Sequence, residues 1–321
     1  MNATLPRWLS SRPSTAALEI TARRVTVAVI GHQNGARVLS AYASEPLAPG
    51  VVEPSLNASN IHDAAALSMT IRKALDGVTP RPKRVALVLP DTVAKLSLLR
   101  FEKIPPKVQD LDQLIRWQIR KAAPFKAEDA QVAWVPGVAL SEGGREYVVT
   151  VARRDVIESY ERACEAGGAH PGIVDVASIN LVNAVLAGLA GSPPAADWLL
   201  VNVAPDYSTI VVVRAGDVVF FRTRVSDTDA DLADLVHQTS MYHEDRLGGG
   251  GFSRVVLAGA SSRGVERAER LRREMEERVG AAVEPLDFRG TVAMRDRIVA
   301  GPELLDTLAP SVGVILREQA V

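Results

Sequence analysis

Few side chains in this sequence stand in a pattern that could do chemistry. His237 and His243, with Glu244 and Asp245 beside them, are residue types that bind metals. Six residues along a helix turn the two histidines away from each other, so we interpret them as surface or cleft residues. The run Gly248–Gly251 has the composition of a phosphate loop, but it follows a predicted helix and no Lys-Ser/Thr pair comes after it. We therefore predict a helix end there.

Composition excludes several classes of function. Lys and Arg total 37 against 38 Asp and Glu, so no overall field attracts nucleic acid or anionic lipid. The single cysteine, Cys164, excludes an internal disulfide and is expected in the core rather than as a nucleophile. Five His and 5% aromatic residues form no recognisable catalytic triad or base-stacking surface. No apolar run reaches the length of a membrane span, and residues 1–15 are expected to be a flexible leader without a signal peptide.

The order of predicted elements repeats along the chain. In each half, three short strands precede a helix, and an apolar strand follows that helix. In the first half these elements are expected at 16–21, 25–30, 37–44, 61–75 and 84–89, with a tight turn at Asn34-Gly35. In the second half they are expected at 198–203, 207–213, 217–224, 229–247 and 254–257. Two copies in one chain predict a duplicated α/β fold with a cleft between two lobes.

A separate unit is predicted between the copies. Residues 92–101 are strand-like, 109–123 form an amphipathic helix that Pro124 ends, and two alternating strands follow at 130–135 and 146–152. The expected domains are therefore a first lobe, an inserted strand-helix-strand-strand subdomain and a trimmed second lobe. Their expected bounds are 16–91 with 172–192, 92–171, and 193–321.

This plan resembles the actin-like superfamily, and within it the PilM branch of type IV pilus assembly proteins. The match covers roughly 16–317, and the order of its motifs carries it rather than any one of them. The similar segments are Leu18-Glu19-Ile20 with 25–29, 45–50, 85–90, 98–134, 174–176, 201–213, 255–259 and 308–313.

The resemblance implies a cytoplasmic adaptor, peripheral to the inner membrane through a partner. Members of this family bind the N-terminal cytoplasmic tail of a bitopic membrane protein, PilN, in a groove between the inserted subdomain and the first lobe. Here that expectation points to Ile115, Gln118, Ile119 and Phe125. Plain core packing is the alternative for Leu114 and the two isoleucines. The pilus motor ATPase and self-association are further expected contacts.

The resemblance also implies a cleft for ATP and Mg²⁺, with Asp and Gly in two phosphate loops. In the first loop Glu19 replaces the aspartate, no glycine follows it, and Thr21 keeps a hydroxyl. In the second loop Asn202 is neutral, Ala204 replaces a glycine and Pro205 lacks an amide donor. The other residues expected around this degraded cleft are Asp206, Ser208, Thr209 and Gly259.

The resemblance also implies a glycine pair and two helices between the third strand of the second half and the long helix at 229–247. Here that segment is missing, and with it the contacts expected to base or ribose. We therefore predict a non-enzymatic scaffold with no metal site, in which nucleotide is not expected to bind. The alternative is an actin-like ATPase whose nucleotide state regulates partner binding or self-assembly.

Overall fold

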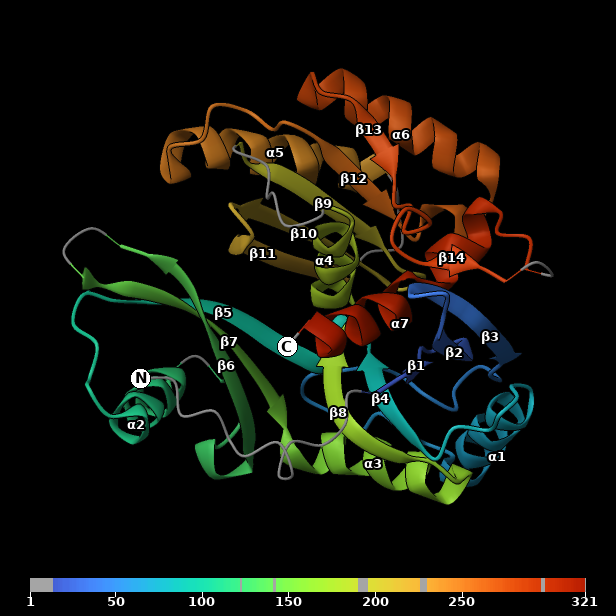
Figure 1. Ribbon diagram of the computed structural model, residues 1–321. Helices are drawn as coiled ribbons and strands as arrows, with labels where there is room; N and C mark the ends of the chain where they lie inside the picture. The colour runs from blue at the N-terminus through green and yellow to red at the C-terminus, as the bar shows by residue number, and fades with distance from the viewer. Residues whose placement is uncertain are drawn as a thin grey trace.

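The computed structural model describes residues 14–121, 123–140, 143–189, 196–225, 230–295 and 298–320. These residues form three β-sheets, with helices on their faces and between them (Figure 1). The predicted leader lies outside the described residues except for its last two positions. Within the described residues, no helix is both long and apolar enough to cross a bilayer.

The first sheet has the strand order β14-β3-β2-β1-β4-β8. Its strands are β1 (Ala16–Ile20), β2 (Arg24–Gln33), β3 (Ala36–Pro46), β4 (Arg84–Leu89), β8 (His170–Val176) and β14 (Ala293–Met294). The first three form an antiparallel meander, whereas β4 and β8 run parallel to β1. Asn34 and Gly35 both have positive φ, which confirms the predicted tight turn. Helices α1 (Ala64–Asp76) and α3 (Arg154–Gly167) pack on one face.

The second sheet repeats the strand order of the first. Its order is β11-β10-β9-β12-β13, with β9 (Trp198–Val203), β10 (Tyr207–Arg214), β11 (Asp217–Val225), β12 (Val255–Ala258) and β13 (Val283–Pro285). Helices α5 (Ala230–Leu247) and α6 (Val265–Val279) cover its outer face (Figure 1). The predicted duplication is therefore confirmed. In the described part of the chain, α5 is the helix that connects β11 to β12, as expected for a trimmed lobe.

The inserted subdomain has its own small core. It consists of β5 (Ala94–Phe101), α2 (Val108–Ile119), β6 (Ala130–Ala139) and β7 (Arg145–Arg153), in the sheet order β5-β7-β6. Because side chains alternate along a strand, β7 turns Tyr147, Val149 and Val151 toward α2 and turns Thr150 and Ala152 to the opposite face. The predicted strand-helix-strand-strand order is confirmed.

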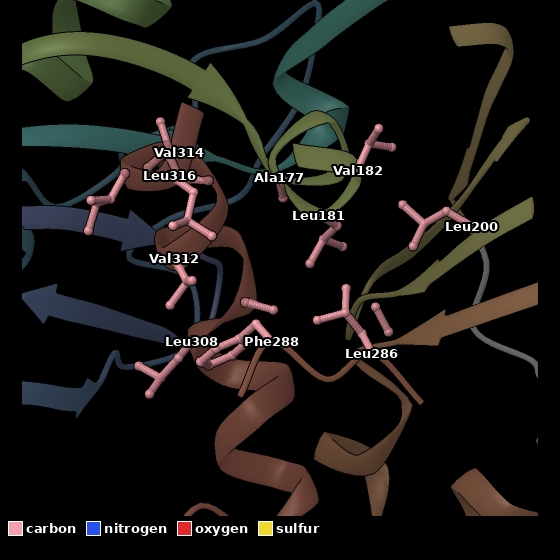
Figure 2. Packing of buried hydrophobic residues seen from close by; sticks show 14 of the residues in the cluster. Ala177, Leu181, Val182, Leu200, Leu286, Phe288, Leu308, Val312, Val314 and Leu316 are labelled. Atoms are coloured by element: carbon pink, nitrogen blue, oxygen red, sulfur yellow. The ribbon is translucent and has the colours of Figure 1, made fainter. Parts of the chain in front are cut away.

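Two helices lie between the sheets and join the lobes. They are α4 (Ala177–Gly188) and α7 (Pro302–Ala320). Figure 2 shows Leu308 and Val312 of α7 and Leu181 of α4 in one cluster with Leu200 of the second sheet. Gly313 lets the helices approach closely, since a Cβ at this position would lie 1.7 Å from the carbonyl oxygen of Asn180. The lobes therefore share one continuous apolar core.

The packing of the elements gives subdomain bounds that differ from the expected ones. The expected insert, 92–171, included α3, but this helix packs its Val156, Tyr160 and Cys164 stripe on the first sheet. The expected second lobe, 193–321, included β14 and α7, yet β14 pairs with β3 and α7 contacts β1 and β2. The reason is physical: an apolar stripe packs on the nearest uncovered face, wherever it lies in the sequence.

Candidate functional site

A buried carboxylate joins the two lobes at the base of the cleft. Asp91 opens the short 3₁₀ turn η1 (Asp91–Val93) directly after β4, and it is 2% exposed. Its Oδ1 accepts a hydrogen bond from the backbone N–H of Ser178, 2.9 Å away, at the start of α4. Its Oδ2 accepts bonds from the Ser178 hydroxyl and from Thr209 Oγ1, the latter at 2.7 Å. Asp91 therefore caps α4 and holds β10 at the same time.

The network continues into the second sheet. Asn202 Nδ2 of β9 donates to Ser178 Oγ at 2.9 Å, and Thr209 and Thr223 hydroxyls lie 2.9 Å apart. Burial raises the pKa of Asp91, while the hydrogen bonds from Ser178, Thr209 and Asn202 oppose this rise. Both Asn202 and Thr209, predicted around the cleft, are thus occupied by contacts within the protein.

Glu19 and Arg24 lie beside this network on the first lobe. Burial raises the pKa of Glu19 to about 7, although the charge of Arg24 works in the other direction. Arg24 Nη2 lies 4.0 Å from Glu19 Oε2, which is a distant ion pair rather than a hydrogen bond. Glu19 Oε2 and Arg24 Nε are buried and have no hydrogen-bond partner among the described residues. These two atoms could bind water or a polar ligand.

The other predicted cleft residues serve mainly to shape loops. Thr21 Oγ1 donates to the carbonyl of Arg24 at 3.1 Å and so closes the first turn. Burial raises the pKa of Asp206, against the charges of Arg23 and Arg263. Ser208 is buried in β10. At Gly259, φ is 78° and a Cβ would lie 2.5 Å from the carbonyl oxygen of Val203.

The cleft does not fit a nucleotide as it stands. Its cavity is about 40 Å³, whereas small-molecule sites usually measure about 300–1,000 Å³. Three carboxyl groups line it, those of Glu19, Asp206 and Asp306, and the one cation in its described lining is Arg24, so this cavity offers phosphate little net attraction. In the described residues, no group of three His, Cys, Asp or Glu side chains is placed to hold a metal ion. A cavity of this size suits a few water molecules.

The residues predicted to contact a partner lie elsewhere than expected. Ile115 and Ile119 are 0% and 4% exposed in the core of the inserted subdomain, so the alternative of core packing is correct for both. Phe125 is half-buried against the same core, and Gln118 is half-buried on α2. None of the four lines a hollow between this subdomain and the first lobe. The reason is that α2 turns its apolar stripe toward its own sheet.

A hollow of about 310 Å³ does lie between these two units. One wall is β8, at the edge of the first sheet, with the N-terminal half of α3 near it. The facing wall is the side of β6 and β7 opposite α2. The lining residues are Leu89, Val93, Ala94, Gln131, Ala133, Thr150, Ala152, Ile157, Glu161 and 171–176. Sequence reasoning missed them because they come from four separated segments.

The charged residues that line this hollow are both acidic. Asp175 pairs with Arg317 of α7. Glu161 has no ion-pair partner within the described part of the chain, and burial followed by the charges of Glu158 and Glu165 raises its pKa. The hollow therefore combines an apolar surface, the edge strand β8, one face of β6 and β7, and the carboxyl group of Glu161, which has no ion pair in the described residues.

The residues set aside on sequence grounds have structural roles. The interpretation of His243 as a surface or cleft residue is wrong: it is fully buried, stacks on Phe252 and places its Nε2 2.5 Å from Asp197 Oδ2. His237 lies apart from His243, and its Nδ1 is 3.3 Å from the carbonyl oxygen of Arg278. Cys164 is buried, and burial raises the pKa of its thiol to about 12, so it is a core residue as predicted.

Comparison with known proteins matches residues 17–244 to the family described as type IV pilus assembly protein PilM. Among solved structures, the chain is similar to a chain of a PilM-PilN type IV pilus biogenesis complex. The TM-score is 0.81 and the identity 19%, covering 96% of this chain and 99% of that chain. A Bacteroides thetaiotaomicron protein with an actin-like ATPase fold and unknown function has a TM-score of 0.50 at 10% identity, covering 88% and 94%. No curated protein matches the sequence significantly. These likenesses show that the fold is actin-like.

Proposed function

Because the chain belongs to the family of type IV pilus assembly protein PilM, we propose that it is a non-enzymatic adaptor of a type IV pilus, or of a related type II secretion-like platform. In this proposal it binds the cytoplasmic N-terminal tail of a PilN-like inner-membrane protein. It stays in the cytoplasm and reaches the inner membrane through that partner. Contacts with the pilus motor ATPase and self-association remain predictions.

The observation that carries this proposal is the hollow between β8 and the inserted subdomain. Its volume of about 310 Å³ is at the lower end of the range for ligand sites. β8 and β6 are edge strands, and an extended peptide can pair with such an edge while its side chains enter neighbouring pockets. The similar solved structure is that of a PilM-PilN complex, which supports a PilN-like partner.

The closed cleft supports the non-enzymatic part of the proposal. Asn202 and Thr209, which could have bound a metal or phosphate, are hydrogen-bonded within the network of Asp91. Opening the cleft would break these bonds and separate the apolar core that α4 and α7 share with both sheets. We infer that the two lobes act as a rigid support for the hollow.

Titration of a labelled PilN-like tail peptide tests the proposal. Ala133→Trp places an indole in the hollow, and we expect it to weaken binding at least tenfold. Ala139→Trp is the matched control, because Ala139 is exposed on the same strand but does not line the hollow. Failure of the peptide to bind the unmodified chain, or equal loss in both variants, would count against the hollow as the binding site.

One observation favours the alternative of a nucleotide-dependent protein. Glu19 Oε2 and Arg24 Nε are buried polar atoms with no partner in the part of the chain that the structure describes, and such atoms often contact a ligand. If Mg-ATP binds, it should raise the melting temperature by mass action. We expect no shift; a shift of several degrees that Asn202→Lys abolishes would favour the alternative.

A further inference from the structure

The outward face of α2 is unusual because it exposes a tryptophan. Residues at i, i+3 and i+4 share a helix face, so Gln113, Trp117, Arg120 and Lys121 lie together, opposite the buried Leu111, Ile115 and Ile119. We call the first four the α2 outer face. Trp117 is 56% exposed, and the Lys121 ammonium lies 5.3 Å from the centre of its ring. This arrangement presents an indole and a cation together to the solvent.

The charge around this face differs from that of the whole chain. Residues 103–126 carry six Lys or Arg and two Asp, whereas the chain as a whole has a net charge of -1. One of the two acids, Asp112, is occupied by Arg116 at 2.7 Å and by Trp134 Nε1 at 3.0 Å. In the described residues, Arg120 and Lys121 make no ion pair. The end of α2 is therefore a local basic surface.

Further apolar side chains are exposed at the other end of the helix. Val108 is 69% exposed and Ile104, just before α2, is 36% exposed, but Val108 has the spacing of the buried stripe and so lies outside the α2 outer face. An exposed aromatic group beside cations that make no ion pair in the described residues is typical of segments that lie in a membrane interface. Figure 1 shows α2 at the outer edge of the molecule, with the three-stranded sheet between it and the lobes.

The shape of this region favours a membrane over a peptide. A peptide segment needs a groove or a free strand edge, and the hollows described above are lined by other elements. A bilayer surface instead accepts a protruding helix, with indole at the headgroup level and Lys or Arg near lipid phosphates. A nucleic acid is disfavoured because a single indole provides no stacking surface.

We propose that the α2 outer face is a membrane-contact surface that binds anionic lipid headgroups. Trp117 enters the headgroup region, while Arg120 and Lys121 lie close to the phosphates. This contact with lipid does not involve the tail-binding hollow. The lipid contact and the tail contact are each expected to be weak, and together they would hold the chain more firmly at the membrane than either would alone.

Flotation of the full chain with vesicles tests this proposal. We expect the chain to float with vesicles of phosphatidylcholine mixed with phosphatidylglycerol, to float poorly with phosphatidylcholine alone, and to be released by salt. Arg120→Glu with Lys121→Glu should weaken binding roughly tenfold or more, since each cation near an anionic surface contributes about a fivefold affinity. Trp117→Ser should weaken it several-fold.

Arg246→Glu with Arg270→Glu is the matched control. Both residues are exposed on other helices, so this variant changes the net charge by the same amount without altering α2. Circular dichroism melting checks that each variant is folded.

If the unmodified chain floats with neither kind of vesicle, the proposal is overturned, and an acidic protein is left as the occupant of this face. Equal loss in the control and the α2 variant would overturn it too, because overall charge would then explain the binding. Neither result would bear on the tail-binding hollow.

Discussion

At the scale of single residues, the cleft holds carboxyl groups whose pKa values are raised by burial. Glu19 has a pKa of about 7, and the pKa of Asp91 is also raised. Asp91 is fully hydrogen-bonded, whereas Glu19 has an oxygen without a partner. Among these carboxyl groups, the free-energy cost of ionisation is therefore clearest for Glu19.

Glu19→Gln should change how stability depends on pH. Because the pKa of Glu19 lies above its usual 4.5, the stability that its neutral form provides is complete below about pH 4.5 and is lost as the pH rises to about 7. We expect the variant to match the original protein at pH 4.5 and to exceed it by up to about 3 kcal/mol at pH 8. Urea unfolding of both proteins at the two pH values measures the difference. A difference that does not vary with pH would contradict the assignment.

Glu161→Lys should weaken binding of the tail peptide. Glu161 lines the hollow without an ion-pair partner in the described residues, and cytoplasmic segments next to a membrane span are commonly rich in Lys and Arg. We expect a loss of about tenfold, which titration of the labelled peptide measures. Glu266→Lys, an identical charge change on the exposed side of α6, is the control. Binding that Glu161→Lys leaves unchanged would mean that the tail makes no charged contact here.

Some residues of the cleft and the hollow could be predicted from the sequence, and others could not. The residues of the two loops lie next to strands whose order is visible in the sequence, so Glu19, Asn202 and Asp206 were placed together around the cleft. Asp91 was missed because its environment comes from α4 and β10, far along the chain. Ile115 and Ile119 were assigned to a groove, since an apolar stripe alone does not tell a helix that packs on its own sheet from one that receives a partner.

At the scale of elements, periodicity predicted the strands and helices of both repeats. Their apolar runs and turn residues are local signals, as at Asn34-Gly35. Strands β8 and β14 and helix α4 were not assigned individually. β14 has only two residues, and α4 is apolar on most sides, so neither has a clear period. Such elements are fixed by tertiary packing rather than by local sequence.

The contact between α4 and α7 depends on one glycine. A methyl group at position 313 would overlap the Asn180 carbonyl, so Gly313→Ala must push the helices apart. We expect a loss of about 2–3 kcal/mol in the free energy of unfolding, measured with urea. Gly290→Ala is the control, because a Cβ there meets no atom within 4 Å. Equal stability of the two variants would contradict the close approach of α7 to α4 at Gly313.

At the scale of the whole molecule, both lobes share one core. Residues from the first sheet, the second sheet, α4 and α7 belong to a single buried cluster, which Val148 of the inserted subdomain also joins. We expect one calorimetric transition on heating, because neither lobe keeps a complete core without the other. Two resolved transitions would show that the lobes unfold independently and that the cleft opens more easily than proposed.

We propose above all that the hollow binds the tail while the cleft needs no nucleotide. Calorimetric titration of the chain with the PilN-like tail peptide, with and without Mg-ATP, tests both parts together. We predict binding with the same Kd in the two conditions and binding at least tenfold weaker in Ala133→Trp. Binding that requires Mg-ATP, or that Ala133→Trp leaves intact, would contradict the account.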